Sequence, residues 1–287
     1  MRIRPHAVAG RFYDSDSAAC QRAIDEYTAC PTLGYTPRVY GGVVPHAGWI
    51  CSGAVAGRVF AALAHESVET FVLFGTAHTV PTHESIVDEH DAWQTPLGQV
   101  AIDHEMRSAM CQQNSNLRLD ASAHAQEHSL EVVVPFIQHL FPNAKILPIV
   151  VPPFEQAMHV GSGTVPVANA LGRKVVVLAS TDLTHYGPRY RFTPKGVGPE
   201  AIAWATQTND ARMIELIAVM DSNAVLPEAQ SNHNACGPGA IGATLLACRQ
   251  LGATKGVTVC QTNSNEVLRR QYGEMNDAVG YVGMVFV

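Results

Sequence analysis

Three histidines and one aspartate occupy positions from which they could bind a metal ion or move a proton. Each closely follows an apolar segment: His46 follows residues 39–44, His78 follows residues 71–75, and Asp182 and His185 follow residues 175–180. The Val and Leu content of these segments predicts β-strands, and α/β sheets place their ligands where the carboxyl ends of the strands meet. We therefore expect the four side chains at one edge of a sheet.

The repetition of this arrangement favours a functional interpretation over a structural one. A single histidine commonly does no more than hydrogen-bond within a loop, and that interpretation fits His46 or His78 taken alone. Residues that only satisfy a core have no reason to recur after three strands, whereas a metal or acid/base site needs several donors that converge on one point. Asp182 and His185 are also three residues apart, which would put them on one face of a helical turn.

Cys236 is a candidate anionic ligand. It lies in the segment Asn-Ala-Cys-Gly at residues 234–237, directly before an apolar stretch that predicts a helix over 238–251. Backbone donors and the macrodipole at a helix N-terminus lower the pKa of a thiol and favour the thiolate, which binds metals and attacks electrophiles. The alternative is a buried and unreactive cysteine, because free cysteines are among the most often buried side chains.

A second polar cluster occupies residues 124–131. Its sequence, His-Ala-Gln-Glu-His-Ser-Leu-Glu, is not the HExxH zinc signature. Glu127 and His128 are predicted to orient metal ligands or to contact a substrate, because imidazoles that bind metals usually need such partners. The alternative is local, with Ser129 capping the following helix and Glu131 in its first turn.

The apolar patterns along the chain predict alternating strands and helices, and hence an α/β fold with a central mixed β-sheet flanked by helices. The expected strands are 39–44, 71–74, 145–151, 174–179, 256–259 and 278–287, and the expected helices are 15–29, 53–64, 104–113, 129–141, a weakly patterned 155–171, 200–220 and 238–251. Neither an internal repeat nor a linker interrupts the pattern, so residues 1–287 are expected to form a single domain.

Composition excludes several classes of function. The net charge is −6 and the basic residues are scattered, so no nucleic-acid partner is expected. No long apolar segment follows the N-terminus, which predicts a cytoplasmic protein without a membrane span. The seven cysteines form no CxxC pair, so most are expected to be reduced and buried. P-loop, dinucleotide-binding and nucleophile-elbow motifs are missing from the sequence.

Seven motifs, in order along the whole chain, are similar to those of the Memo family, whose prokaryotic branch is named AmmeMemoRadiSam system protein B. The motifs are residues 6–13, Pro-His-Ala-Gly at 45–48, Gly-Thr-Ala-His at 75–78, Thr-Pro-Leu-Gly at 95–98, Glu-His-Ser-Leu-Glu at 127–131, Ser-Thr-Asp-Leu-Thr-His-Tyr-Gly at 180–187 and Asn-Ala-Cys-Gly at 234–237. That family resembles the class III extradiol ring-cleaving dioxygenases, α/β enzymes that hold non-haem iron(II) with two histidines and a carboxylate. The resemblance implies the same fold here.

The resemblance also implies roles for individual residues. His46 and His78 match the two histidine positions, and Cys236 matches the position where Memo proteins have a thiol instead of the carboxylate. Asp182 and His185 match an acidic residue and a histidine that line the same pocket.

The chain departs from the family pattern at three positions. Thr79 replaces a frequent second histidine, Tyr186 replaces a frequent tryptophan, and Pro238 stands where a polar or basic residue is usual. These changes leave the implied ligands intact and affect the contacts around them, and with them the substrate preference. Tyr186 is grouped with Glu127 and His128 as lining the pocket.

The leading hypothesis is a metal-dependent oxidoreductase or dioxygenase-like enzyme with His46, His78 and Cys236 as ligands. Asp182 would be a fourth ligand or an orienting group, and His185, with an ordinary pKa near 6.5, would act as acid and base. Iron(II) is the first choice of metal, and copper and zinc also suit these ligands.

Two other functions remain open. The first is a non-catalytic module that binds a peptide or small anion in the same pocket, and the second is a zinc-dependent hydrolase. A small molecule or a peptide is the expected partner in each case, and the sequence leaves the oligomeric state open.

Overall fold

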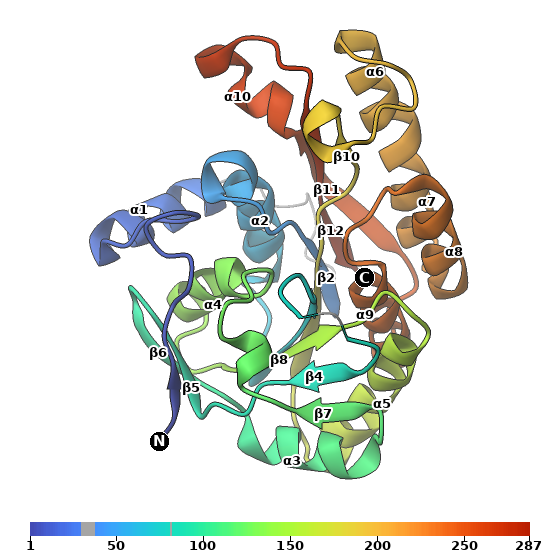
Figure 1. The fold of residues 1–287 in the computed structure, drawn as a ribbon. Coiled ribbons are helices and arrows are strands. Elements are labelled where there is room, and N and C mark those ends of the chain that lie inside the picture. Colours follow the sequence, from blue (N-terminus) through green and yellow to red (C-terminus); the bar gives the residue numbers. More distant parts are fainter. Residues whose placement is uncertain (30–37, 81) are drawn as a thin grey trace.

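The computed structural model describes residues 1–29, 38–80 and 82–287. Its centre is a mixed β-sheet with the strand order β10-β12-β2-β9-β3-β8-β4-β7, in which β11 also pairs with β12 (Figure 1). The strands are β2 (Gly41–Val44), β3 (Thr70–Thr76), β4 (Ser85–Val87), β7 (Leu117–Leu119), β8 (Lys145–Val151), β9 (Val175–Ser180), β10 (His185–Tyr186), β11 (Gly256–Asn263) and β12 (Ala278–Phe286). The predicted α/β class with a central mixed sheet is confirmed.

Parallel pairing at the centre of the sheet positions the candidate residues. β9 lies between β2 and β3 and is parallel to both, and β8 continues the parallel part beyond β3. The last residue of β2, Val44, pairs with the last residue of β9, Ser180, and Phe74 of β3 pairs with Ala179. The carboxyl ends of β2, β9 and β3 therefore meet at one edge, as the sequence predicts.

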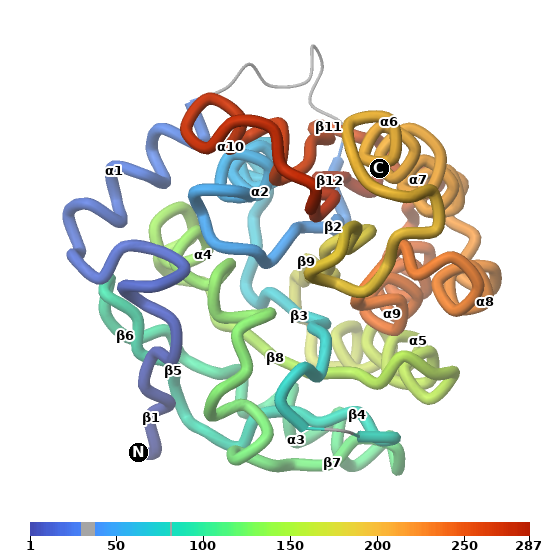
Figure 2. The backbone as a smooth tube through the Cα atoms, turned by 45° about the horizontal axis from the view of Figure 1, so that its top comes forward, coloured from blue at the N-terminus to red at the C-terminus, as the bar shows by residue number. Residues whose placement is uncertain are grey.

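Helices bury both faces of the sheet. Along β3, Phe71 and Leu73 pack against one hydrophobic cluster while Val72 and Phe74 pack against another, which is the two-residue alternation of a strand. The first cluster contains side chains of α1 (Ser17–Thr28), α2 (Trp49–Leu63) and α4 (Val134–Leu140). The second contains side chains of α3 (His104–Gln113), α5 (Gln156–Ala170), α7 (Ala211–Ala218), α8 (Ser222–Asn232) and α9 (Pro238–Leu251), and Figure 2 shows α1, α2 and α4 across the sheet from α5, α8 and α9.

The elements that the sequence pattern misses are short or irregular. β4 and β7 have three residues each, and a separate small sheet has the order β1-β5-β6, with β1 (Ile3–Arg4), β5 (Ala92–Thr95) and β6 (Gly98–Ala101). The predicted helix over 200–220 is divided into α6 (Pro199–Trp204), a π-helix (Ala205–Asp210) and α7. Two helices went unpredicted: α8, which contains Pro227, and α10 (Ser264–Tyr272).

The described cysteines are free thiols, as expected, but only some of them are buried. Cys20 and Cys248 are buried, Cys51, Cys111 and Cys260 are half-buried, and Cys30 lies outside the described residues. Among the described helices, none combines the length and the apolar character that a membrane span requires.

Close packing of α5 against α9 gives a stability prediction. A Cβ atom at Gly161 would lie 2.4 Å from the Ala243 carbonyl oxygen of α9, whereas one at Gly163 would meet only Asn114 at 3.6 Å. We expect Gly161→Ala to lower the free energy of unfolding by about 1–3 kcal/mol, because backbone atoms cannot give way easily. Urea denaturation measures this. Gly163→Ala, in the same helix, is the control and should be neutral or stabilising by up to about 1 kcal/mol; equal effects would contradict the packing explanation.

Candidate metal centre

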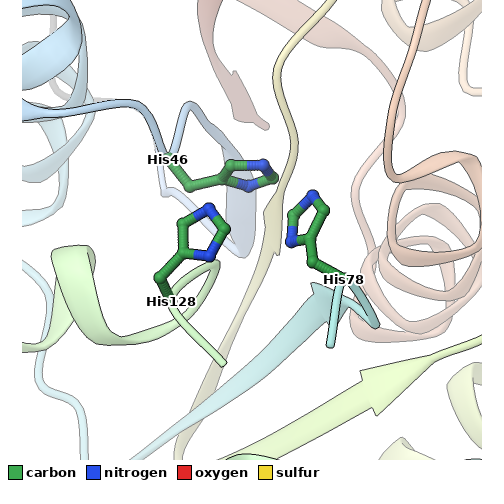
Figure 3. Close-up of side chains that lie close together, drawn as sticks. All are labelled: His46, His78 and His128. Carbon is green, nitrogen blue, oxygen red and sulfur yellow. The ribbon is translucent and has the colours of Figure 1, made fainter. Parts of the chain in front are cut away.

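Three imidazole rings converge at the carboxyl edge of the parallel strands. Ring nitrogens of His46, His78 and His128 all lie within 4.8 Å of one another, a grouping that could hold a metal ion (Figure 3). The His78 and His128 rings are stacked with centroids 4.7 Å apart, and His46 meets them edge-on at 5.0 and 5.8 Å. His46 is buried, while the side chains of His78 and His128 are 30% and 25% exposed, so solvent or a ligand can reach the group.

The strands explain why distant histidines meet. His46 follows β2 by two residues and His78 follows β3 by two, and β9 between them ends two residues before Asp182. Asp182 Oδ1 accepts a hydrogen bond from the His46 backbone N–H at 2.8 Å, which joins the two loops. The loop position of His128, just before the short 3₁₀ helix Glu131–Val133, brings a third ring to the same point. Sequence reasoning had given His128 a supporting role, and the Glu-His-Ser-Leu-Glu motif was its only signal.

Cys236 lies next to His46. Its Sγ is 3.3 Å from His46 Nε2 and accepts a hydrogen bond from the Asp182 backbone N–H at 3.2 Å. The Cys236 N–H in turn donates to the Asp182 carbonyl oxygen at 3.1 Å. Gly237 is the N-cap of α9, so the thiol has the expected place beside a helix N-terminus.

The charges of the site follow from these contacts. Burial alone would raise the pKa of the Cys236 thiol, but the adjacent His46 lowers it to about 5. Burial would lower the pKa of His78, yet hydrogen bonds with Cys236 and Glu127 raise it to about 10. Burial and the neighbouring His46 and His78 lower the pKa of His128 to about 4. At neutral pH the site therefore combines a thiolate with a neutral His128 imidazole.

Glu127 is a buried carboxylate beside His78. Its Oε1 lies 3.1 Å from His78 Nδ1, and its Oε2 accepts from the His78 backbone N–H at 2.7 Å. The backbone N–H groups of His128 and Ser129 donate to Oε1 at 2.9 and 2.8 Å. Burial alone would raise the pKa of Glu127, but these hydrogen bonds, that to His78 first, lower it to about 2.

Asp182 and His185 do not share a helical turn, so that part of the sequence prediction is wrong. Residues 181–184 have no regular structure and His185 begins β10, because this segment continues alongside β12. Asp182 Oδ2 still faces the site, 3.9 Å from His46 Nε2. His185 Nδ1 lies 3.1 Å from the Leu183 carbonyl oxygen, and its ring is edge-on to Tyr190.

Tyr186 is fully buried beside the next segment of the chain. Its ring contacts Phe192 and Trp204, and its hydroxyl donates to the Gly196 carbonyl oxygen and accepts from the Lys195 N–H. These contacts stabilise the loop between β10 and α6. The predicted place of Tyr186 in the pocket stays a prediction.

A π-helix ties together the two loops that carry Asp182 and Cys236. Asp210 Oδ1 accepts hydrogen bonds from the Thr184 N–H at 2.9 Å and from the Thr184 hydroxyl. The Asn209 side-chain amide donates to the same hydroxyl at 3.0 Å. The Asn209 backbone carbonyl oxygen accepts from the Asn234 side-chain amide at 2.8 Å. π-Helical turns are rare and frequent at functional sites. Here the turn directs two consecutive polar residues inward to hold both loops.

Burial of Asp210 predicts a pH-dependent stability. Burial raises the pKa of Asp210 to about 7, although hydrogen bonds from Thr184 oppose the rise. A carboxyl group whose pKa is raised on folding binds its proton more tightly in the folded state, so its contribution to stability falls as pH rises from about 4 to 7. Asp210→Asn should remove this fall, as measured by urea denaturation at several pH values. The exposed Asp14 changed to Asn is the control, and an unchanged slope in Asp210→Asn would contradict the prediction.

Fold and site define an α/β protein with a cluster of side chains that could hold a metal ion at the carboxyl edge of its parallel strands. The sequence profile of the Memo-like proteins matches residues 4–285, and the chain belongs to this family. It is 34% identical over 292 aligned residues to a MEMO1 family protein of Thermococcus onnurineus, with 99% of both chains covered. It is 35% identical to one from Methanothermobacter thermautotrophicus over 97% of this chain and 98% of the other. The resemblance predicted from the motifs is confirmed.

Proposed function

We propose that this Memo-family protein is a metal-dependent redox protein, similar to dioxygenases, whose metal is held by His46, His78 and Cys236. The observation that carries the proposal is the convergence of two imidazoles and a sulfur from three separate loops. Two ligands of one tetrahedral ion, with bonds of about 2.1 Å to nitrogen and 2.3 Å to sulfur, lie roughly 3–4 Å apart. The distance of 3.3 Å between Cys236 Sγ and His46 Nε2 fits this requirement.

Iron(II) is the metal that we favour. Two imidazoles and one anionic ligand would leave coordination positions open on iron(II), which would supply the redox chemistry of oxygen activation. Copper and zinc match the same ligand types, so the donors alone do not choose among the three metals. His128, which is neutral and has a ring nitrogen within 4.8 Å of those of His46 and His78, is the alternative third ligand in place of Cys236.

Asp182 and His185 are the residues that we propose to hold and move protons. Asp182 Oδ2 lies 3.9 Å from His46 Nε2, close enough to bind the ion or to accept a proton from a bound substrate. The Leu183 carbonyl oxygen beside His185 Nδ1 can only accept a hydrogen bond, so Nδ1 carries a proton. The other ring nitrogen, Nε2, is then available to exchange a proton with a substrate. Both groups can therefore act without losing the contacts that position them.

Metal analysis of anaerobically purified protein tests the proposal, followed by measurement of oxygen consumption with catechols. Stoichiometric iron and oxygen uptake that depends on it would support a redox enzyme. Zinc without oxygen uptake would support a hydrolase instead. Protein that binds no metal under these conditions would overturn the proposal.

The ligand set makes a separate prediction. Cys236→Ser should release the metal, because a serine hydroxyl is not ionised at neutral pH and binds soft metals poorly. His128→Ala should retain it, because His128 is not among the proposed ligands. Metal content after dialysis measures both variants, with Cys111→Ser as the control for loss of a half-buried thiol. Retention in Cys236→Ser and loss in His128→Ala would assign the site to the three histidines.

A binding module without catalysis is the second candidate function. It is favoured by the replacement of the expected carboxylate by Cys236, since iron(II) sites that cleave rings use an anionic oxygen ligand. The half-exposed His78 and His128 could instead contact a small anion or a peptide, with Phe12 packed edge-on against His128. Ligand binding that survives chelation and His46→Ala would favour the module.

A further inference from the structure

We infer that the segment Glu127–Ser129 is a positioning element that fixes which ring nitrogen of His46 and of His78 faces the metal. Glu127 acts on His78 directly, and Ser129 acts on His46 through Ser180. The role of these residues in metal binding rests on the proposed function. The proton positions on the two rings can be tested without a metal.

We call each chain of hydrogen bonds that orients a ring a relay. The first relay runs from Glu127 to His78. Glu127 Oε1 lies 3.1 Å from His78 Nδ1, and an ionised carboxylate can only accept hydrogen bonds. Nδ1 must therefore carry a proton, and Nε2 is the nitrogen that can bind a metal once it has released its own proton. Glu127 Oε2 also accepts from the His78 backbone N–H at 2.7 Å, so one carboxylate holds both the ring and the main chain of this residue.

The second relay orients His46. Its Nδ1 lies 3.1 Å from Ser180 Oγ, a hydroxyl that could in principle donate or accept. Ser180 has a single hydroxyl proton, and it donates that proton to the Ser129 carbonyl oxygen at 2.5 Å. Ser180 can therefore only accept from His46, so Nδ1 is again the protonated nitrogen and Nε2 faces the site, 3.3 Å from Cys236 Sγ.

The relays are rigid because they share one buried segment. The Ser129 N–H donates to Glu127 at 2.8 Å, and the Ser129 hydroxyl donates to the Thr76 carbonyl oxygen at the end of β3. Glu127, Ser129 and Ser180 are each at most 1% exposed, so water does not compete for these hydrogen bonds. Both rings are thus held with Nδ1–H on its acceptor and Nε2 toward one point, so an ion has to displace no proton other than that of Nε2.

Nitrogen-15 NMR of the histidine rings tests the proton positions in the protein without metal and with zinc(II). We expect a protonated Nδ1 on both His46 and His78 in each state, and Nε2 bound to zinc in the second. An unprotonated Nδ1 on either ring would overturn the inference. If wild-type protein fails to bind zinc, iron or copper while both Nδ1 atoms are protonated, the proposed function fails and the relays stand.

Two variants separate the relays. Ser180→Ala should change the ring signals of His46 and leave those of His78, and Glu127→Gln should do the reverse. Each should also weaken zinc binding by about 10–100-fold, the usual effect of removing a hydrogen-bond partner of a metal ligand. The controls are Ser162→Ala and Glu155→Gln, which lie on or beside α5. Wild-type zinc affinity in both relay variants, or signal changes spread over all the histidines, would contradict selective positioning.

Discussion

Replacement of His46 by alanine is expected to abolish stoichiometric metal binding, with the dissociation constant raised by more than about 100-fold. Loss of an outer hydrogen-bond partner costs 10–100-fold, and loss of a ligand itself costs more. His46 also lies beside two further groups of the site, with Nε2 3.3 Å from Cys236 Sγ and 3.9 Å from Asp182 Oδ2. Removal of the His46 ring leaves Cys236 and Asp182 without the imidazole that lies beside both of them.

Metal affinity is measured by competition with a chelator under anaerobic conditions. His159→Ala is the matched control, because His159 lies on the exposed part of α5, away from the cluster. The control should bind metal as the wild type does. Stoichiometric metal in His46→Ala with wild-type affinity would rule out the proposed centre.

The sequence predicts that His46, His78 and Asp182 lie at one edge, because this placement depends on a general property of parallel sheets. The apolar segments before His46, His78 and Asp182 predict strands, and the pairing of β2 with β9 and of β9 with β3 then brings their ends together. For these three residues, the missing information was the relative order of the strands. Tertiary contacts between neighbouring strands supply it.

Residues placed by irregular segments were beyond prediction. His128 lies in a loop that no strand or helix pattern marks, and its ring packs against Phe12, His46 and His78, contacts that form only in the folded chain. The spacing of Asp182 and His185 fits a helical turn as well as an extended segment, and pairing with β12 selects the extended form. In the same way, β4 and β7 are too short for a two-residue alternation to be recognised; β4 pairs with β8, and β7 pairs with β4.

Substitution of Arg4 by methionine is expected to lower the free energy of unfolding by about 3–5 kcal/mol, the range for breaking one partner of a buried ion pair. Arg4 and Glu131 are both completely buried, with Nη1 2.7 Å from Oε2. The guanidinium also donates to the carbonyl oxygens of His124 and Glu127 at 2.6 and 2.7 Å, and it packs 4.1 Å from the centre of the Trp93 ring. Methionine fills part of the volume but leaves these acceptors and one buried charge without their partner.

Removal of Arg4 should also disturb residues 6–13, because Glu131 contacts both Arg4 and this segment. This carboxylate accepts from the backbone N–H groups of Ala7 and Val8 and from the Tyr13 hydroxyl, so it connects residues 6–13 with residues 127–131. Urea denaturation measures the effect. Arg2→Met is the matched control, because its ion pair with Glu89 is largely exposed and should contribute less than about 1 kcal/mol. A loss in Arg4→Met no larger than in Arg2→Met would show that the buried pair does not hold the N-terminal segment in place. A loss of the expected size should also weaken metal binding, because Arg4 holds the main chain at Glu127, the residue that orients His78.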